Sequence, residues 1–143
     1  MASNTRPQFK HPIPTRSSGS VDELSWITEE ELAGVKPNTG VRQFNWNGLK
    51  IIVRHLISLD EMQKLVGLVL DQCWDGERMR RELLDFHLRC AVVVFFTNVN
   101  LPQKAEEQYE YLYGTDLYET VVQYVSASQI KAIEDALKMY VSQ

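Results

Sequence analysis

Residues 41–57 read VRQFNWNGLKIIVRHLI, and this stretch decides the fold. The pair Asn47-Gly48 divides it into two apolar-rich runs. Both positions of a two-residue hairpin turn require a positive φ angle, which asparagine and glycine adopt most readily. The stretch therefore predicts a β-hairpin. Two strands alone are only marginally stable, so we expect the hairpin to pack on helices, to pair with another chain, or both.

Helical patterns follow the hairpin. Ser58 and Glu61 have the spacing of a capping box, and apolar residues then recur on one helix face as far as Cys73. A second helix is expected from about Met79 to Phe96, and its last residues, CAVVVFF, are apolar on every side. Valine and phenylalanine also favour a buried strand, but the helical spacing of the preceding apolar residues favours a helix. Such a helix is expected at the centre of the fold.

Shorter helical segments complete the C-terminal part. An acidic, tyrosine-rich helix is expected over 103–113 and another over 117–124. Ser126 and Gln129 have the spacing of a further capping box, which predicts a last helix over 127–141. The expected fold class is mainly α with one β-hairpin (α+β), in which residues 41–143 form a compact domain of the hairpin and the helices.

An extended N-terminal arm and a short helix precede this domain. Thr28 and Glu31 predict a capping box, and Gly34 and Pro37 end the helix, so residues 21–40 are expected to hold a short helix and a linker. Residues 1–20 contain three prolines and few large apolar side chains. Such a composition cannot build a core, and we expect a flexible basic arm.

Charge is unevenly distributed along the 143 residues. The total is −4, and the first 20 residues carry +3 without a single acidic side chain, so the rest of the chain carries −7. An acidic protein with a basic tail is typical of a tail that binds a separate acidic surface, although a solvated tail is the simpler alternative. The acidic excess argues against a nucleic-acid-binding protein.

Neither a membrane protein nor a secreted one is indicated. The longest uninterrupted apolar run, Cys90–Phe96, is far shorter than a membrane span, and the N-terminus lacks the apolar core of a signal peptide. Two cysteines are too few for a disulfide scaffold, so we interpret Cys73 and Cys90 as buried thiols in a reducing compartment.

The motifs that carry catalytic or cofactor chemistry are missing from the sequence. It contains no glycine-rich phosphate loop, no Cys-x-x-Cys pair and no His-Glu-x-x-His motif. His87 and Cys90 would share a helix face, and with Cys73 they would offer three soft ligands to zinc. Their apolar surroundings and the lack of a fourth ligand favour core packing. We expect no enzyme, no cofactor and no metal.

Aromatic and basic residues are the candidates for partner binding. Tyr109 and Tyr113 would share a helix face, and Phe44 and Trp46 a strand face. Tyrosine is enriched at interfaces, although packing at the edge of the core is the alternative for these side chains. The candidate partner-binding residues are Arg6, Phe9, Lys10, Arg16, Trp26, Phe44, Trp46, Tyr109, Tyr111 and Tyr113.

From Trp46 onward, about two thirds of the chain resembles a family of small tailed-bacteriophage proteins. The resemblance lies in NGLKIIVRHLISLDEM after Trp46, in the turn FFTNVNLP at 95–102 and in YEYLYGTDL at 109–117. It implies a tail assembly chaperone or a small structural protein of the head or tail, and it implies no catalytic residues. The basic, proline-containing arm departs from the chaperone version and favours the structural one.

These observations predict a non-enzymatic phage virion structural or assembly protein. Its body and arm would bind a larger head or tail component, so the expected partner is a phage capsid or tail protein and possibly a second copy, without membrane or nucleic acid. The expected location is the host cytoplasm during assembly and then the virion. The alternative is a small acidic inhibitor or adaptor that blocks a basic partner protein through the acidic residues Glu106, Glu107, Glu110, Asp116 and Glu119.

Overall fold

The computed structural model describes residues 25–142. It divides into two units, Met1–Pro37 and Asn38–Gln143, and each is considered by itself. In the first unit the described part holds the short helix α1, Glu29–Ala33. The predicted capping box is confirmed: Thr28 Oγ1 accepts from the Glu31 N–H at 3.0 Å, and Glu31 Oε1 accepts from the Thr28 N–H at 2.9 Å.

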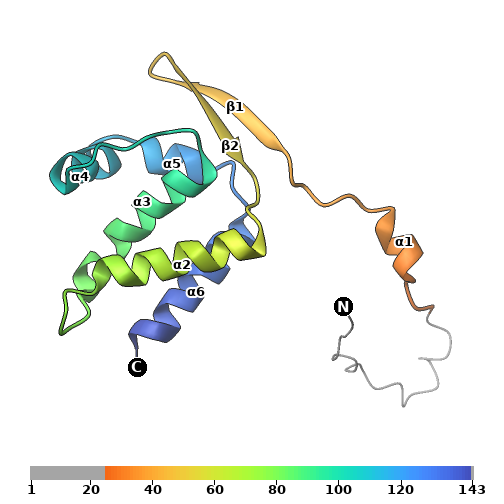
Figure 1. Ribbon diagram of the computed structural model, residues 1–143. Helices are drawn as coiled ribbons and strands as arrows, with labels where there is room; N and C mark the ends of the chain where they lie inside the picture. Colours follow the sequence, from red (N-terminus) through yellow and green to blue (C-terminus); the bar gives the residue numbers. More distant parts are fainter. Residues whose placement is uncertain (1–24, 143) are drawn as a thin grey trace. The chain divides into compact units, whose positions relative to one another are not determined.

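The second unit opens with the predicted hairpin. Strand β1, Val41–Trp46, pairs antiparallel with strand β2, Leu49–Arg54 (Figure 1). Asn47 and Gly48 form the turn with φ angles of 51° and 79°. Both values are positive, as a two-residue hairpin turn requires, so the sequence signal is confirmed at the level of the backbone.

Helices make up most of the remainder, which confirms the predicted mainly α fold with one hairpin. They are α2 (Leu59–Cys73), the 3-10 turn η2 (Arg81–Leu83), α3 (Leu84–Phe96), α4 (Ala105–Gly114), α5 (Leu117–Val122) and α6 (Ala127–Val141). The structure describes no helix with both the length and the apolar character needed to cross a membrane.

The second predicted helix begins later than expected. It was predicted from about Met79, but α3 starts at Leu84. Met79 forms an isolated antiparallel bridge with Trp74, and the Arg80 N–H donates to the Cys73 carbonyl at 2.7 Å. These contacts hold the chain in a tight reversal after α2, so the helix starts only once the reversal is complete.

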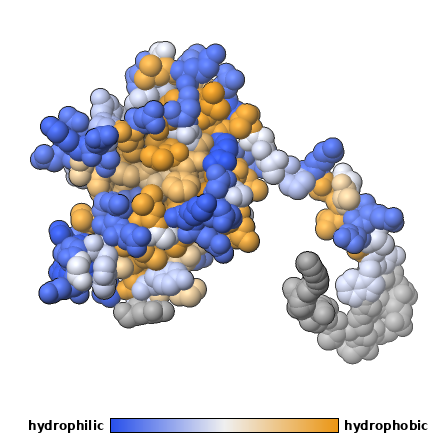
Figure 2. Space-filling model, in the orientation of Figure 1, coloured by the Kyte–Doolittle hydropathy of each residue, from blue (hydrophilic) through white to orange (hydrophobic). Residues whose placement is uncertain are grey.

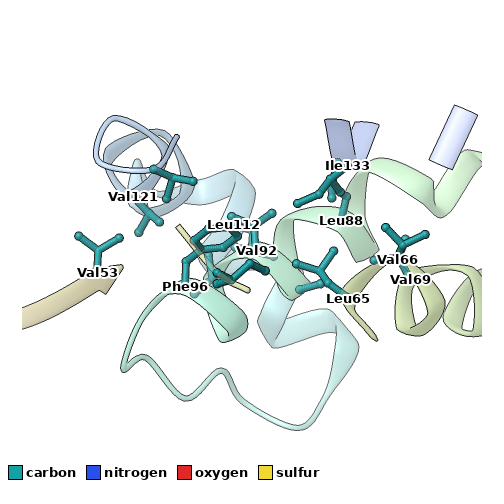
Figure 3. Close-up of a cluster of buried hydrophobic side chains, with 14 of the residues drawn as sticks. Val53, Leu65, Val66, Val69, Leu88, Val92, Phe96, Leu112, Val121 and Ile133 are labelled. Carbon is teal, nitrogen blue, oxygen red and sulfur yellow. The ribbon is translucent and has the colours of Figure 1, made fainter. Parts of the chain in front are cut away.

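Helix α3 lies at the centre of the core, as its apolar composition predicts. Its buried residues are Leu88, Ala91, Val92, Val93 and Phe96. Figure 3 shows Val92 and Phe96 among side chains from β2, α2, α4, α5 and α6. Burial of each such side chain stabilises the fold by about 1.5–3 kcal/mol. The run CAVVVFF is therefore a central helix and not a strand.

A buried glutamine joins α6 to the segment between β2 and α2. Ser126 caps α6 by accepting from the Gln129 N–H at 3.2 Å, but the Gln129 side chain does not complete the predicted capping box. Its Oε1 accepts from the Ile57 N–H, and its Nε2 donates to the Ile57 carbonyl, both at 2.9 Å. The prediction of a reciprocal box was wrong because the buried backbone of Ile57 needs both partners.

An ion pair ties β2 to α2 and α3. Arg54 donates to both carboxylate oxygens of Glu61, at 3.1 and 2.9 Å, and to the Phe95 carbonyl at 2.6 Å. The Glu61 carboxylate also accepts from the Ser58 N–H, which completes the predicted capping box of α2. The hydrogen bonds from Arg54 and from Ser58 lower the pKa of Glu61 to about 2.

We predict that Gln129→Ala destabilises the protein by about 2–3 kcal/mol, because it leaves both polar groups of the buried Ile57 backbone without partners. Urea unfolding measures the difference. The matched control is Gln72→Ala, at an exposed position of α2. Equal losses in the two variants would show that the contact to Ile57 contributes nothing.

A second prediction concerns acid. Because the pKa of Glu61 in the folded protein lies below its ordinary value of 4.5, its stabilisation is present above that pH and is lost as pH falls toward 2. Glu61→Gln should therefore lower the stability at about pH 6 and flatten its fall between about pH 6 and about pH 3. Urea unfolding at both values, with Glu110→Gln as the control, tests this; parallel curves for wild type and Glu61→Gln would contradict it.

Candidate interaction surfaces

The first candidate surface is the segment around α1. Among the predicted partner-binding residues of the N-terminal part, Arg6, Phe9, Lys10 and Arg16 lie outside the described residues. Trp26 is described and is 62% exposed. The large apolar side chains around it are Ile27, Leu32 and Val35, which are 61–74% exposed. We call residues 25–35 the α1 segment.

The α1 segment combines exposed apolar side chains with an acidic first helical turn. None of its residues is buried, and Figure 2 shows apolar and hydrophilic residues next to one another there. Ile27 and Leu32 occupy the positions on either side of the N-cap where a hydrophobic staple forms. Glu29, Glu30 and Glu31 make the first turn acidic. A helix of five residues is too short to be stable alone, so its capping box is its main local support.

Two predicted residues of the hairpin contact the chain's own body. Phe44 and Trp46 share a face, as predicted, and both are partly buried against the core. The Phe44 ring stacks on Tyr124, with centroids 4.6 Å apart and planes 3° from parallel. The Trp46 Nε1–H donates to Asp116 Oδ1 at 2.8 Å. This face of the hairpin therefore packs on the domain, and a role of these two residues in partner binding stays a prediction.

The outer edge of β2 has a partner that the sequence analysis missed. Asn98 follows α3, and its side-chain Oδ1 accepts from the Ile52 N–H at 2.9 Å. The Asn98 N–H donates in turn to the Ile52 carbonyl at 3.2 Å, and Asn98 Nδ2 donates to the Lys50 carbonyl at 3.4 Å. One asparagine thus binds both backbone groups of Ile52 and the Lys50 carbonyl, in the place that a third strand would take.

The predicted tyrosine cluster forms the exposed surface of α4. Tyr109 and Tyr113 stack at 4.8 Å, and Phe86 of α3 lies 6.2 Å from Tyr109, centroid to centroid. Tyr109 is 57% exposed and Tyr113 39%. Tyr111 is also exposed but is not part of this stack. The rings cover a seam between α3 and α4 while keeping their hydroxyl groups in reach of solvent or a partner.

Arg89 organises the charges beside the stack. It forms ion pairs with Asp85 at 2.9 Å and with Glu119 at 3.0 Å. Its guanidinium lies 4.6 Å from the centroid of Tyr113 and 4.7 Å from that of Tyr118, close enough for cation–π attraction. Burial and the hydrogen bond that Tyr113 donates to Asp85 raise the pKa of Tyr113. Asp85 and Arg89 therefore both contact Tyr113 and fix the position of its ring.

A hollow of about 650 Å³ lies over this seam and combines acidic and aromatic side chains. Its lining includes Phe86, Tyr109, Glu106 and Glu110. Among residues 25–142, neither of these glutamates forms an ion pair, and the same holds for Glu107. Free carboxylates beside aromatic rings suit a basic side chain, through charge and cation–π contacts together.

The other two acidic residues of the alternative hypothesis already have partners. Asp116 accepts the hydrogen bond from Trp46, and Glu119 is paired with Arg89. The acidic surface therefore consists of Glu106, Glu107 and Glu110 on α4. It is smaller than the sequence suggested, because a sequence does not show which carboxylates already have partners within the fold.

The three soft side chains considered for zinc do not form a ligand set. Burial lowers the pKa of His87 and raises the pKa of the Cys90 thiol to about 11. Cys90 Sγ lies 3.6 Å from Gln108 Oε1, to which it donates, and Cys73 is buried in the core. No cluster of three or more histidine, cysteine or acidic side chains suited to a metal ion occurs within residues 25–142.

Comparison with known protein families, with curated proteins and with solved structures gives no match for this chain. Function is therefore inferred from the geometry of the surfaces described above.

Proposed function

We propose that this chain is a non-enzymatic assembly protein that docks on a larger protein partner through the α1 segment. The observation that carries the proposal is the exposure of Ile27, Leu32 and Val35, at 61–74%, in and on either side of a helix of only five residues. Exposed apolar side chains of this size mark a surface that another protein can cover. Leu32 and Val35 are three positions apart, the i and i+3 spacing that apolar anchors have in helix-in-groove recognition.

The chemistry of the segment defines the partner surface. Three consecutive glutamates, Glu29 to Glu31, flank the apolar anchors, so the complementary surface is an apolar groove with a basic rim. Burial of each large apolar side chain contributes about 1.5–3 kcal/mol, which offsets the cost of ordering a short segment. The basic residues of the arm, among them Arg6, Lys10 and Arg16, supply a second contact, with an acidic surface of the partner.

The resemblance to small tailed-phage proteins supports a role in the assembly of a phage particle. In that setting the partner is a capsid or tail protein, the chain is made in the host cytoplasm, and it ends as a component of the virion. The body contributes a preformed platform, and the N-terminal segments contribute the attachment. This division of roles fits a chain whose contacts separate Met1–Pro37 from the rest.

A second candidate function is that of an acidic adaptor that covers a basic partner protein. The observation that favours it is the set of unpaired carboxylates on α4, Glu106, Glu107 and Glu110, beside the exposed ring of Tyr109. The two candidates differ in their response to salt. Exposed charge pairs are screened by salt, whereas apolar docking is not weakened by it.

For the proposed function we predict that the double substitution Leu32→Ala with Val35→Ala lowers incorporation of the full chain into phage particles at least about tenfold, because two apolar anchors are lost. Immunoblots of purified particles measure the copy number. The matched control is Leu59→Ala with Val94→Ala, which removes the same side-chain types from exposed positions of α2 and α3. Circular dichroism checks that all variants are folded.

Equal incorporation of the two double variants would contradict docking through the α1 segment. A third variant, with Glu106, Glu107 and Glu110 all changed to glutamine, separates the candidates. If this variant alone fails to associate, and wild-type association falls steeply with added salt, the acidic adaptor is the better account.

A further inference from the structure

The two outer edges of the hairpin differ. In an antiparallel pair, successive residues turn their N–H and C=O groups alternately toward the neighbouring strand and away from it. Ile52 of β2 turns both groups outward, since both bind Asn98. Gln43 of β1 is directly opposite Ile52, so Gln43 also turns its N–H and C=O away from the hairpin.

The same alternation applies along the rest of β1. Val41 and Asn45 lie two residues to either side of Gln43 and turn their backbone groups to the same outer edge. Within residues 25–142, no hydrogen bond from outside the hairpin reaches the backbone of these three residues. All three are exposed, and Figure 1 shows β1 on the side of the hairpin away from α3 and α5. Asn98 covers the middle of the β2 edge, whereas within residues 25–142 nothing covers the edge of β1.

Strand β1 also lacks the features that normally protect an open edge. Natural proteins discourage pairing there with proline, bulges or charged side chains. The six residues of β1 contain no proline and pair without a bulge. Arg42 is their single charged residue, and its guanidinium lies 5.7 Å from the centroid of the Tyr124 ring, on the face that packs on the body. Nothing in β1 opposes a further strand.

We propose that β1 pairs antiparallel with β1 of a second copy, about a two-fold axis through Gln43, to form a four-stranded sheet. This register uses the free groups of Val41, Gln43 and Asn45 in both copies, and it forms roughly six backbone hydrogen bonds. Val41 faces Asn45 of the second copy, and Arg42 faces Phe44. No like charges oppose each other, and a cation faces an aromatic ring.

Neighbouring registers are poorer. A two-fold axis through Arg42 would place the two Arg42 side chains opposite each other, and like charges in facing positions are destabilising. An axis through Phe44 would place Val41 opposite Asn47, which lies in the turn with a φ of 51° and cannot continue a strand. The strand is therefore self-complementary in one register.

The chain's own arm is a poorer occupant of this edge than a second β1. Residues 1–20 contain Pro7, Pro12 and Pro14, and each proline lacks the N–H that a strand must donate. A second copy of β1 offers an unbroken strand of six residues. The proposed pairing does not depend on docking through the α1 segment, because it uses different residues.

Sedimentation velocity of the full chain over a range of concentrations tests the pairing. We expect wild type to form a dimer with a dissociation constant in the micromolar range, in keeping with a small interface. Gln43→Lys and Gln43→Glu should each weaken the dimer at least about tenfold, because like charges then meet on the two-fold axis. An equimolar mixture of these two variants should dimerise again, because opposite charges meet there.

Two further variants separate backbone pairing from a general effect of the side chain. Gln43→Pro removes the outward N–H and should abolish the dimer, whereas Gln43→Thr keeps it and should dimerise like wild type. Circular dichroism and tryptophan fluorescence check that each variant is folded. A wild-type chain that stays monomeric throughout, or a dimer that is equally stable in the Lys, Glu and Pro variants, would overturn the proposal.

Discussion

A two-stranded hairpin leaves backbone N–H and C=O groups along both outer edges, and a stable fold must give them partners or leave them to water. In this protein the hairpin's inner face packs on the body through Phe44, whose ring stacks on Tyr124. At the edge of β2, Asn98 binds both backbone groups of Ile52 and the Lys50 carbonyl. Within residues 25–142, the edge of β1 has no comparable partner. The proposed pairing of two copies follows from this difference between the two edges.

Further contacts hold the hairpin to the helices at and just after the end of β2. Gln129 binds both backbone groups of Ile57, and Arg54 joins Glu61 to the Phe95 carbonyl. Each of these side chains connects segments that meet only in the folded chain. They fix the hairpin against α2, α3 and α6, so the open edge of β1 is presented on a rigid support. A rigid edge loses less conformational entropy when it binds than a loose one.

The sequence predicts those features that depend on near neighbours. The positive φ angles of Asn47 and Gly48, the capping boxes at Thr28 and Ser58, and the central helix with CAVVVFF all follow from local patterns. Contacts between distant residues do not. Asn98 lies 46 positions from Ile52, and Gln129 lies 72 positions from Ile57. An exposed loop asparagine and a residue with capping-box spacing give no sign of such partners.

At the candidate surfaces, too, the sequence predicts local features but not contacts between distant residues. Because side chains alternate along a strand, the sequence places Phe44 and Trp46 on one face of β1. Only the fold shows that this face packs on the body. Helical spacing paired Tyr109 with Tyr113, and the structure adds Phe86 from α3 and the hollow beside them. The free edge of β1 could not be seen in the sequence, because an edge is defined by which neighbours are missing. Charge counting likewise overstated the acidic surface, since Glu119 is paired with Arg89.

Hydrogen exchange of the individual β1 and β2 amides, followed by NMR at two protein concentrations, tests the one-sided hairpin most directly. In dilute solution the amides of Val41, Gln43 and Asn45 should exchange rapidly, while the Ile52 amide, bound to Asn98, should be protected. At high concentration the three β1 amides should become protected as well. Protection of those amides in dilute solution, or rapid exchange of Ile52, would contradict the account.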